Sequence, residues 1–365
     1  MNVVGRRQVL QLMTAAGAAA GTQPDASGDV TLKQAAAARG LHFGAAAETN
    51  LGTAPEAYRR LLVSQCELLA PVLPWSVAPR PGEYHFNDAA ATLAFARANR
   101  MPLTGSHLLW HEWLPAWFAG IADRAEAERL VRQHVTTLAT LFAGEVYSWN
   151  VVNEAIRPED GRPDGLRITP LLEKLGPGYI AAAFATARAA DPRAKLLYND
   201  YDMEATSQEA RRDALLRLLD QLQGQGAPID GVGLQSHLRP SMPPDDRRYR
   251  GFLRDIAGRG LEIAVTELDV IESGTLGSVA GRDQVVADCY ARFLAIVLDE
   301  HAVSSVVIWG LSDRYSWENA PSRPQFRRRD GLPARPLPFD EEFRPKPAFH
   351  AIIHALKNAA AHRSG

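Results

Sequence analysis

Short apolar runs of strand length alternate with longer amphipathic segments along most of the chain. Residues 124–142 illustrate the second kind, because their leucines and valines recur at the spacing of one helix face. Such alternation is typical of a parallel α/β fold, and eight strands with intervening helices predict a closed (β/α)8 TIM barrel. The eight predicted strands are residues 41–47, 68–73, 103–110, 146–153, 195–199, 231–236, 263–268 and 304–309.

A doubly wound open sheet is the competing architecture. Such a sheet often carries a glycine-rich turn after its first strand, but neither a G-x-G-x-x-G turn nor a phosphate loop is present in this chain. Barrels of more than about 250 residues fold around one core. We therefore expect a single barrel domain over residues 28–365 of the 365-residue chain.

The charge balance bears on the kind of partner. Forty Lys and Arg residues against 42 Asp and Glu residues leave a formal net charge of −2. The chain therefore has no basic excess with which to bind nucleic acid or an anionic membrane surface. We expect a neutral partner and a monomeric protein.

The first residues resemble an export signal. Arg6 and Arg7 precede a short apolar stretch and a run of small residues, which is the pattern of a twin-arginine signal. The alternative is a frayed, alanine-rich helix, and the apolar stretch is far shorter than the roughly 20 residues that span a bilayer. We expect residues 1–27 to be the signal and a short linker, and the protein to be secreted or periplasmic.

Cysteine usage limits metal chemistry. The two cysteines, Cys66 and Cys289, are too few for a multi-cysteine metal site or a disulfide-rich scaffold. A single bridge between them stays open as an alternative. Since both lie in helix-like segments, we favour two small buried hydrophobic side chains.

Two acids end predicted strands. Glu154 follows the apolar run of the fourth strand, and Glu267 lies at the end of the seventh. An isolated acid at a strand end is ordinarily salt-bridged or solvent-facing. In a barrel, however, both strand ends open at one mouth, so the two carboxyl groups can face each other there. Glycoside hydrolysis uses such a pair, and a separation of roughly 5 to 5.5 Å is typical of the retaining mechanism.

Several motifs together resemble glycoside hydrolase family 10, the endo-1,4-β-xylanase family. They are WNVVNE (149–154), LYNDY (197–201), GLQSH (233–237), VTELD (265–269), WGLSDRYSW (309–317) and RPKPAFHAI (344–352). They occur in the family's order and span nearly the whole predicted domain. The resemblance implies a retaining endo-1,4-β-xylanase that hydrolyses xylan by double displacement, with no metal and no organic cofactor.

The resemblance also implies residue roles. Glu154 would be the acid/base, Glu267 the nucleophile, and Asn153 a donor to the sugar 2-hydroxyl. His237 would hold the nucleophile, with Asp269 behind it to fix its tautomer. Tryptophans would stack on sugar faces, although tryptophan is often simply a core residue. The predicted substrate-binding residues are Trp110, His111, Gln235, Trp309, Trp317 and His107.

Two departures from the family pattern affect the substrate site. Family members carry a histidine where this chain has Ser106, and His107 comes one place later, so either a bulge brings His107 to the site or its sugar contact is lost. The P-E-N-x-x-K-W element after the second strand is reduced to residues 71–75, without its Glu, Asn and Lys. This loss puts the distal glycone subsite in doubt.

Two alternatives to a xylanase therefore stay open at the level of sequence. The chain could be a related barrel glycosidase with another sugar preference, or a weakly active carbohydrate-binding relative. Hydrolysis of an aryl β-xyloside would separate the second alternative from an enzyme. The arginine-rich stretch 323–338 could bind an acidic ligand, but a solvated loop explains it as well, and we favour the loop.

Overall fold

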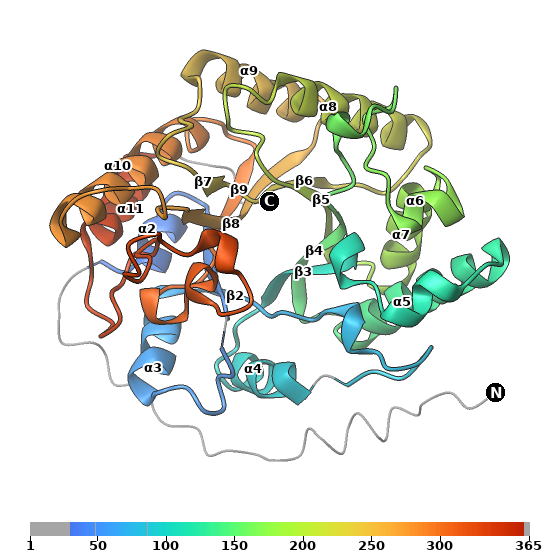
Figure 1. Cartoon of the computed structure of the whole chain (residues 1–365), viewed down its shortest axis with the longest axis horizontal. Helices are drawn as coiled ribbons and strands as arrows, with labels where there is room; N and C mark the ends of the chain where they lie inside the picture. The colour runs from blue at the N-terminus through green and yellow to red at the C-terminus, as the bar shows by residue number, and fades with distance from the viewer. Residues whose placement is uncertain (1–29, 48, 86, 361–365) are drawn as a thin grey trace.

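Eight parallel strands close into a ring at the centre of the molecule (Figure 1). The computed structural model describes residues 30–47, 49–85 and 87–360. Neighbouring strands pair around the ring, with β9 against β1 and β6 against β8, so the (β/α)8 barrel is confirmed. The ring strands are β1 (His42–Ala46), β2 (Leu68–Ala70), β3 (Leu103–Trp110), β4 (Val146–Asn153), β5 (Lys195–Asp200), β6 (Gly231–Leu234), β8 (Glu262–Val270) and β9 (Val303–Ile308).

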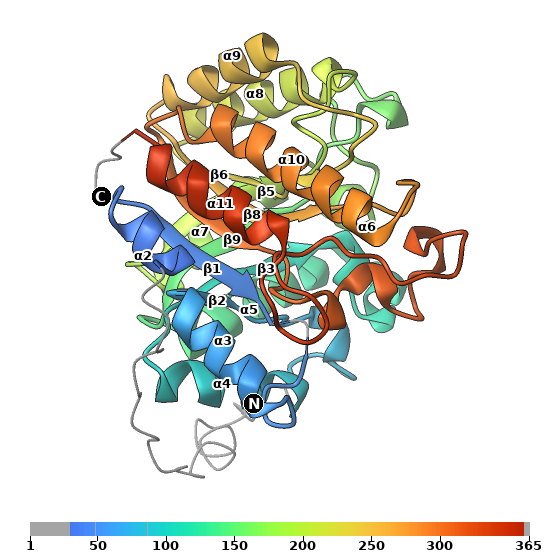
Figure 2. The same cartoon turned by 90° about the vertical axis from the view of Figure 1, so that its left-hand side faces the viewer.

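A further short strand, β7 (His237–Leu238), pairs with the carboxyl end of β8 at Asp269 and Val270. The loop after β9 projects from the same end of the barrel, which is the end toward which the β1 arrow points (Figure 2). The carboxyl ends of the strands and the loops that follow them therefore form one face of the molecule.

Helices surround the ring on its outside (Figure 1). The predicted helix over 124–142 is α5, in which Leu130, Val135 and Leu138 are buried. Each such buried side chain contributes roughly 1.5–3 kcal/mol. The α-helices are α2 (Leu32–Ala37), α3 (Glu56–Gln65), α4 (Asn87–Ala98), α5 (Arg124–Leu141), α6 (Pro170–Leu175), α7 (Tyr179–Ala190), α8 (Glu209–Gly224), α9 (Asp246–Ala257), α10 (Val279–Val297) and α11 (Pro347–Asn358).

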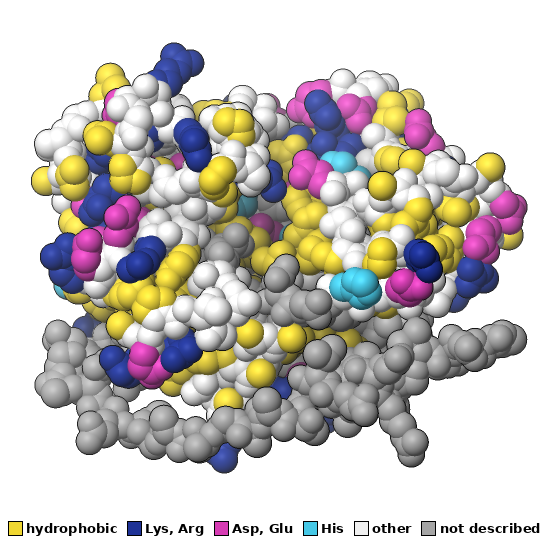
Figure 3. Space-filling view, turned by 60° about the horizontal axis from the view of Figure 1, so that its bottom comes forward, with side chains coloured by type: hydrophobic (Ala, Val, Ile, Leu, Met, Phe, Trp, Pro, Cys, Tyr) yellow, Lys and Arg dark blue, Asp and Glu magenta, His cyan; other side chains and the backbone are white. Residues whose placement is uncertain are grey.

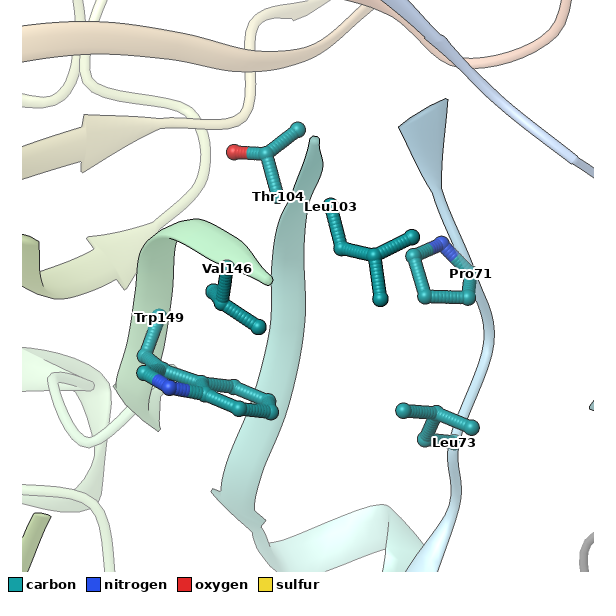
Figure 4. Close-up of a pocket in the computed structure, with 6 residues that line it drawn as sticks. All are labelled: Pro71, Leu73, Leu103, Thr104, Val146 and Trp149. Atoms are coloured by element: carbon teal, nitrogen blue, oxygen red, sulfur yellow. The ribbon is translucent and has the colours of Figure 1, made fainter. Parts of the chain in front are cut away.

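The chain that follows β2 packs against the barrel wall. Figure 4 shows Pro71 and Leu73 opposite Leu103 of β3, with Val146 and Trp149 of β4 beside them. The space between these side chains is too narrow for a water molecule. This segment, which contains the shortened element, therefore contributes apolar packing at Pro71 and Leu73.

The two cysteines do not form a disulfide bond. Both are free; Cys66 is buried as predicted, whereas Cys289 is only half-buried. Burial raises the pKa of both thiols, to about 11 for Cys289. The predicted export signal over 1–27 lies outside the described residues. Within the described residues, no helix combines the length and the apolar character needed to cross a bilayer.

Candidate active site

Glu154 and Glu267 both lie at the carboxyl end of the barrel. Glu154 directly follows β4, and Glu267 lies near the carboxyl end of β8. Both residues are buried, with exposed fractions of 8% for Glu154 and 4% for Glu267. The space-filling view shows a hollow between two raised parts of the surface, with acidic and histidine side chains visible inside it (Figure 3). The pairing predicted from barrel topology is thus present in the structure.

The backbone at Glu154 has an unusual conformation. Its φ is 56°, in the left-handed region that non-glycine residues seldom adopt and that costs about 1–3 kcal/mol. Two hydrogen bonds hold it there: the Glu154 amide donates to the Asn199 carbonyl at 2.9 Å, and Arg167 Nε donates to the Glu154 carbonyl at 2.8 Å. The strain is therefore tolerated because neighbouring strands and loops fix both sides of the peptide.

Three amide side chains connect the two carboxyl groups. Asn153 Nδ2 and Gln235 Nε2 donate to Glu154 Oε1 at 3.1 and 3.0 Å. Asn199 Nδ2 donates to Glu267 Oε1 and to Asn153 Oδ1, both at 2.8 Å. All three amides are buried, so this network fixes the two carboxyls relative to each other.

The same surroundings move the two carboxyl pKa values in opposite directions. Burial raises the pKa of Glu154 to about 7, and the nearby charges of Asp200 and Glu267 add to that effect. Burial also acts to raise the pKa of Glu267, but the hydrogen bond and charge of His237, with smaller contributions from His107 and Asn199, outweigh it and leave that pKa below its ordinary value. Near neutral pH, Glu267 is therefore ionised while Glu154 can hold or release a proton.

His237 stands between two carboxylates. Its Nδ1 lies 2.7 Å from Asp269 Oδ1, and its Nε2 lies 3.5 Å from Glu267 Oε2. Burial acts to lower the pKa of His237, but Asp269 and Glu267 outweigh burial and raise it well above its ordinary value. Trp317 Nε1 donates to Asp269 Oδ2 at 2.6 Å, so Asp269 is held from its other side. The predicted contacts of His237 with both acids are thus present.

A bulge brings His107 to the site. The register between β3 and β4 shifts between Thr104 and His107, and Gly105 within that stretch has a φ of 75°. The bulge alternative predicted from the sequence is thus present, because His107 is buried with its Nε2 3.6 Å from Glu267 Oε1. Burial lowers the pKa of His107, so its ring is neutral near neutral pH.

Aromatic and polar side chains of the predicted substrate-binding set line the same face. Trp110 packs edge-on against Trp113 with ring centroids 5.0 Å apart. Trp309 follows β9 and packs on a small apolar cluster inside the barrel mouth. In the described part of the chain, Trp110 Nε1 and His111 Nδ1 are buried without a hydrogen-bond partner. Such unpaired buried polar atoms are uncommon in folded proteins. Burial lowers the pKa of His111 to about 4.

Two residues of the site were missed by the sequence reasoning. Asn199, in the LYNDY motif, bridges the two halves of the amide network, and Gly233 leaves room for it, because a Cβ there would lie 2.2 Å from Asn199 Oδ1. Arg167 holds the backbone of Glu154 and donates to Tyr201 Oη at 2.9 Å. The polar ending of the fifth strand was a usable signal for Asn199, whereas Arg167 stands in a loop that carries no comparable pattern.

The shortened element after β2 provides no polar group comparable to the family's Glu, Asn and Lys. Val72, Leu73 and Pro74 occupy its middle, and Leu73 is buried in the packing described above. Trp75 is 4% exposed and stacks on His134 with ring centroids 4.2 Å apart. The tryptophan of this element is thus a core residue here. Among the described residues, no cluster of His, Cys, Asp and Glu has the arrangement of a metal site.

Comparisons with known proteins agree with this geometry. The model of Glycosyl hydrolase family 10 matches residues 31–355. Endo-1,4-beta-xylanase B of Thermotoga neapolitana is 32% identical over 349 residues, which are 92% of this chain and 94% of that protein. Endo-1,4-beta-xylanase A of the same organism is 34% identical over 283 residues, 74% of this chain but 25% of that longer protein. The crystal structure of xylanase 10B from Thermotoga petrophila RKU-1 in complex with xylobiose superimposes with a TM-score of 0.80 at 30% identity, covering 90% of this chain and 98% of that chain.

Proposed function

The chain belongs to glycosyl hydrolase family 10, and we propose that it is a retaining endo-1,4-β-xylanase with Glu154 as acid/base and Glu267 as nucleophile. The observation that carries this assignment is that one amide network joins the carboxyl groups of Glu154 and Glu267 at the barrel mouth, where the pKa of Glu154 is raised to about 7 and that of Glu267 is lowered. In such a pair, the carboxyl group with the raised pKa holds the proton and acts as the donor, and the ionised group with the lower pKa acts as the nucleophile. Xylan or a β-1,4-linked xylan oligosaccharide is the substrate.

In the first half of the reaction, a Glu267 oxygen attacks the anomeric carbon of the sugar at the cleavage point. The bond from that carbon to the glycosidic oxygen breaks, and Glu154 gives its proton to the departing oxygen. A covalent glycosyl ester on Glu267 and a free sugar hydroxyl result. A pKa near 7 suits Glu154 to this step, because the group is still substantially protonated near neutral pH.

In the second half, the charge on Glu267 is absent because its oxygen is in the ester. The negative charge of Glu267 is one of the causes that raise the pKa of Glu154, so esterification lowers that pKa. Glu154 is then a carboxylate that takes a proton from an incoming water as the water attacks the anomeric carbon. Glu267 leaves as a carboxylate, and two inversions leave the anomeric configuration retained.

The surrounding residues support these two steps. Asn153 is placed to donate to the sugar 2-hydroxyl, a contact that strengthens in the transition state. The His237–Asp269 pair holds Glu267 ionised and oriented before attack. Trp110 and Trp309, with Trp317, Gln235, His107 and His111, form the proposed walls of the sugar site.

Two variants test the roles of the acids. Glu267→Ala should abolish turnover, and azide should restore it by attacking in place of the carboxylate, giving an α-glycosyl azide. Glu154→Ala should still form the glycosyl ester from a substrate with a good leaving group, but release it slowly, and azide should then give a β-product. Identical responses of the two variants to azide and to leaving group would show that the roles are wrongly assigned.

The anomeric outcome and the substrate are measured on the unmodified protein. Proton NMR of the first product from a β-linked substrate should show the β-anomer, whereas an initial α-anomer excludes the retaining mechanism. Product profiles on xylan, β-glucan and mannan should show release from xylan. Faster release from β-glucan or mannan would replace xylanase by a related glycosidase with another sugar preference.

The shortened element at 72–74 is proposed to weaken the distal glycone subsite. A charged hydrogen bond is worth roughly 1.5–3 kcal/mol and a neutral one about 1, so losing two contacts reduces affinity more than about tenfold. We therefore expect aryl xylobioside to be only modestly better than aryl xyloside, compared by kcat/KM. An increase of several orders of magnitude for the second xylose would show that the subsite works.

Export and a monomeric state are proposed on the sequence alone. Arg6 and Arg7 support the twin-arginine route for residues 1–27. Replacing both by lysine should retain the full-length precursor in the cytoplasm, which fractionation and N-terminal sequencing would detect. Normal export of that variant would rule out this route, and light scattering would measure the oligomeric state of the exported protein.

A further inference from the structure

The loop after β9 is a fixed part of the active-site face. Arg328 donates to Glu272 Oε2 at 2.8 Å, and Arg282 donates to the same oxygen at 3.1 Å, so Glu272 is a buried carboxylate shared by two guanidinium groups. Arg335 adds a two-pronged pair with Asp283, both contacts at 2.9 Å. The interpretation of 323–338 as a simply solvated loop is therefore wrong for Arg328, because neighbouring segments bury and pair it.

Three other arginines of this loop form no ion pair with a carboxylate of the described residues. In the part of the chain that the structure describes, Arg323, Arg327 and Arg329 have no carboxylate within ion-pair distance. Arg327 and Arg329 are exposed on either side of the buried Arg328, and Arg323 is half-buried. The buried anchors thus hold three unneutralised guanidinium groups on one short segment, residues 323–329, which we call the arginine segment.

The arginine segment lies against a tryptophan of the active site. The guanidinium carbon of Arg323 is 5.9 Å from the Trp317 ring centroid, and Phe326 packs edge-on against the same ring at 4.4 Å. Trp317 in turn lies 5.4 Å from the His237 ring and donates to Asp269. Two contacts therefore separate Arg323 from the histidine that holds Glu267.

We propose that the arginine segment binds the carboxylate of a uronic acid substituent on the polysaccharide, so that acidic xylan is the preferred substrate. This inference rests on the proposed function and adds the substrate class. An unsubstituted xylan chain has no charge, so it gives no role to Arg323, which lies against Trp317, or to Arg327 and Arg329 on the same segment. A guanidinium group binds a carboxylate through two parallel N–H donors, which a lysine or an amide cannot match.

The shortened element after β2 is consistent with this substrate. Its Val72 and Pro74 provide no side-chain donors for the xylan backbone. Binding energy from a remote part of the substrate also serves to position the sugar at the cleavage point. A contact to a charged substituent beside Trp317 supplies such energy where the contacts to the distal backbone sugar have been lost.

The experiment compares one polymer in two forms. Xylan that carries uronic acid groups is assayed beside the same xylan after chemical reduction of its carboxyl groups, which leaves the chain and its branches in place. We expect kcat/KM on the acidic form to exceed that on the reduced form about three- to tenfold, which corresponds to about 0.6–1.4 kcal/mol. The ratio should fall toward one as salt screens the charges.

Arginine variants then locate the preference. Arg323→Gln, Arg327→Gln and Arg329→Gln should each lower the ratio of the two kcat/KM values, and the triple variant should bring it close to one. Arg247→Gln is the matched control, because Arg247 is exposed on α9 and has no ion-pair partner among the described residues. This variant should keep the wild-type ratio.

The outcomes separate this inference from the proposed function. If the wild-type protein hydrolyses both polymers equally well, or if the triple variant keeps the wild-type ratio, the inference is wrong and the xylanase assignment stands. If the wild-type protein hydrolyses neither polymer, both are wrong. A preference that disappears with the arginines and with added salt supports a carboxylate site on the arginine segment.

Discussion

Replacing Glu154 by Gln should stabilise the folded protein at alkaline pH. The pKa of Glu154 is about 7 in the folded protein against an ordinary value of 4.5, a difference of about 2.5, and each pKa unit corresponds to about 1.4 kcal/mol. Because the folded state holds this proton more tightly than the unfolded chain, the resulting stability is present below pH 4.5 and is lost as pH rises through 7. At pH 8 the wild-type protein has lost about 3 kcal/mol that the uncharged amide does not lose.

Chemical unfolding measures this effect directly. The free energy of unfolding of Glu154→Gln and of the wild-type protein should be determined in urea at several values between pH 4 and pH 8. The free energy of unfolding of the variant, relative to that of the wild-type protein, should increase by about 3 kcal/mol from pH 4 to pH 8. Acids remote from Glu154 cancel, because they titrate in the same surroundings in both proteins.

Glu267→Gln provides a control of opposite sign. The pKa of Glu267 is lowered in the folded protein, so its ionised form contributes stability above the ordinary pKa and loses it as pH falls through the folded value. Glu267→Gln should therefore be less stable than the wild-type protein at pH 8, with the gap closing in acid. A Glu154→Gln curve that stays parallel to the wild-type curve, or one that follows Glu267→Gln, would refute the assignment of the two protonation states.

Three further predictions concern the surroundings of the acids. Gln235→Leu removes a donor to the acid/base carboxylate, so the alkaline limb of kcat/KM should move up by about one pH unit, and a limb that stays or moves down would contradict the network. Gly105→Ala should lower the free energy of unfolding by about 1–2 kcal/mol and reduce kcat/KM, because alanine strains the left-handed bulge; unchanged values in both assays would show that the bulge tolerates it. Asn199→Ala should reduce kcat/KM on xylan at least about tenfold through loss of a hydrogen bond to the nucleophile, with an unchanged circular dichroism spectrum, and wild-type kinetics would exclude that role.

The order and type of the elements could be predicted from the sequence because they depend on local periodicity. The eight predicted strands correspond to β1, β2, β3, β4, β5, β6, β8 and β9, with ends that differ by a few residues. The positions of Glu154 and Glu267 followed from the same reasoning, since a barrel brings the carboxyl ends of all its strands to one face. The sequence therefore determined the fold and the meeting of the two acids.

Only the tertiary structure decided how each side chain behaves there. A bulge at Gly105 brings His107 toward Glu267. The sequence of β3 alone is compatible with His107 on either face of the strand. In the run 327–329, the middle arginine is buried and paired with Glu272, while its two neighbours are exposed. The pKa values of the two acids separate because His237 and Asn199 reach one of them from other strands. Burial and charge are sums over atoms distant in sequence, and only the folded chain brings those atoms together.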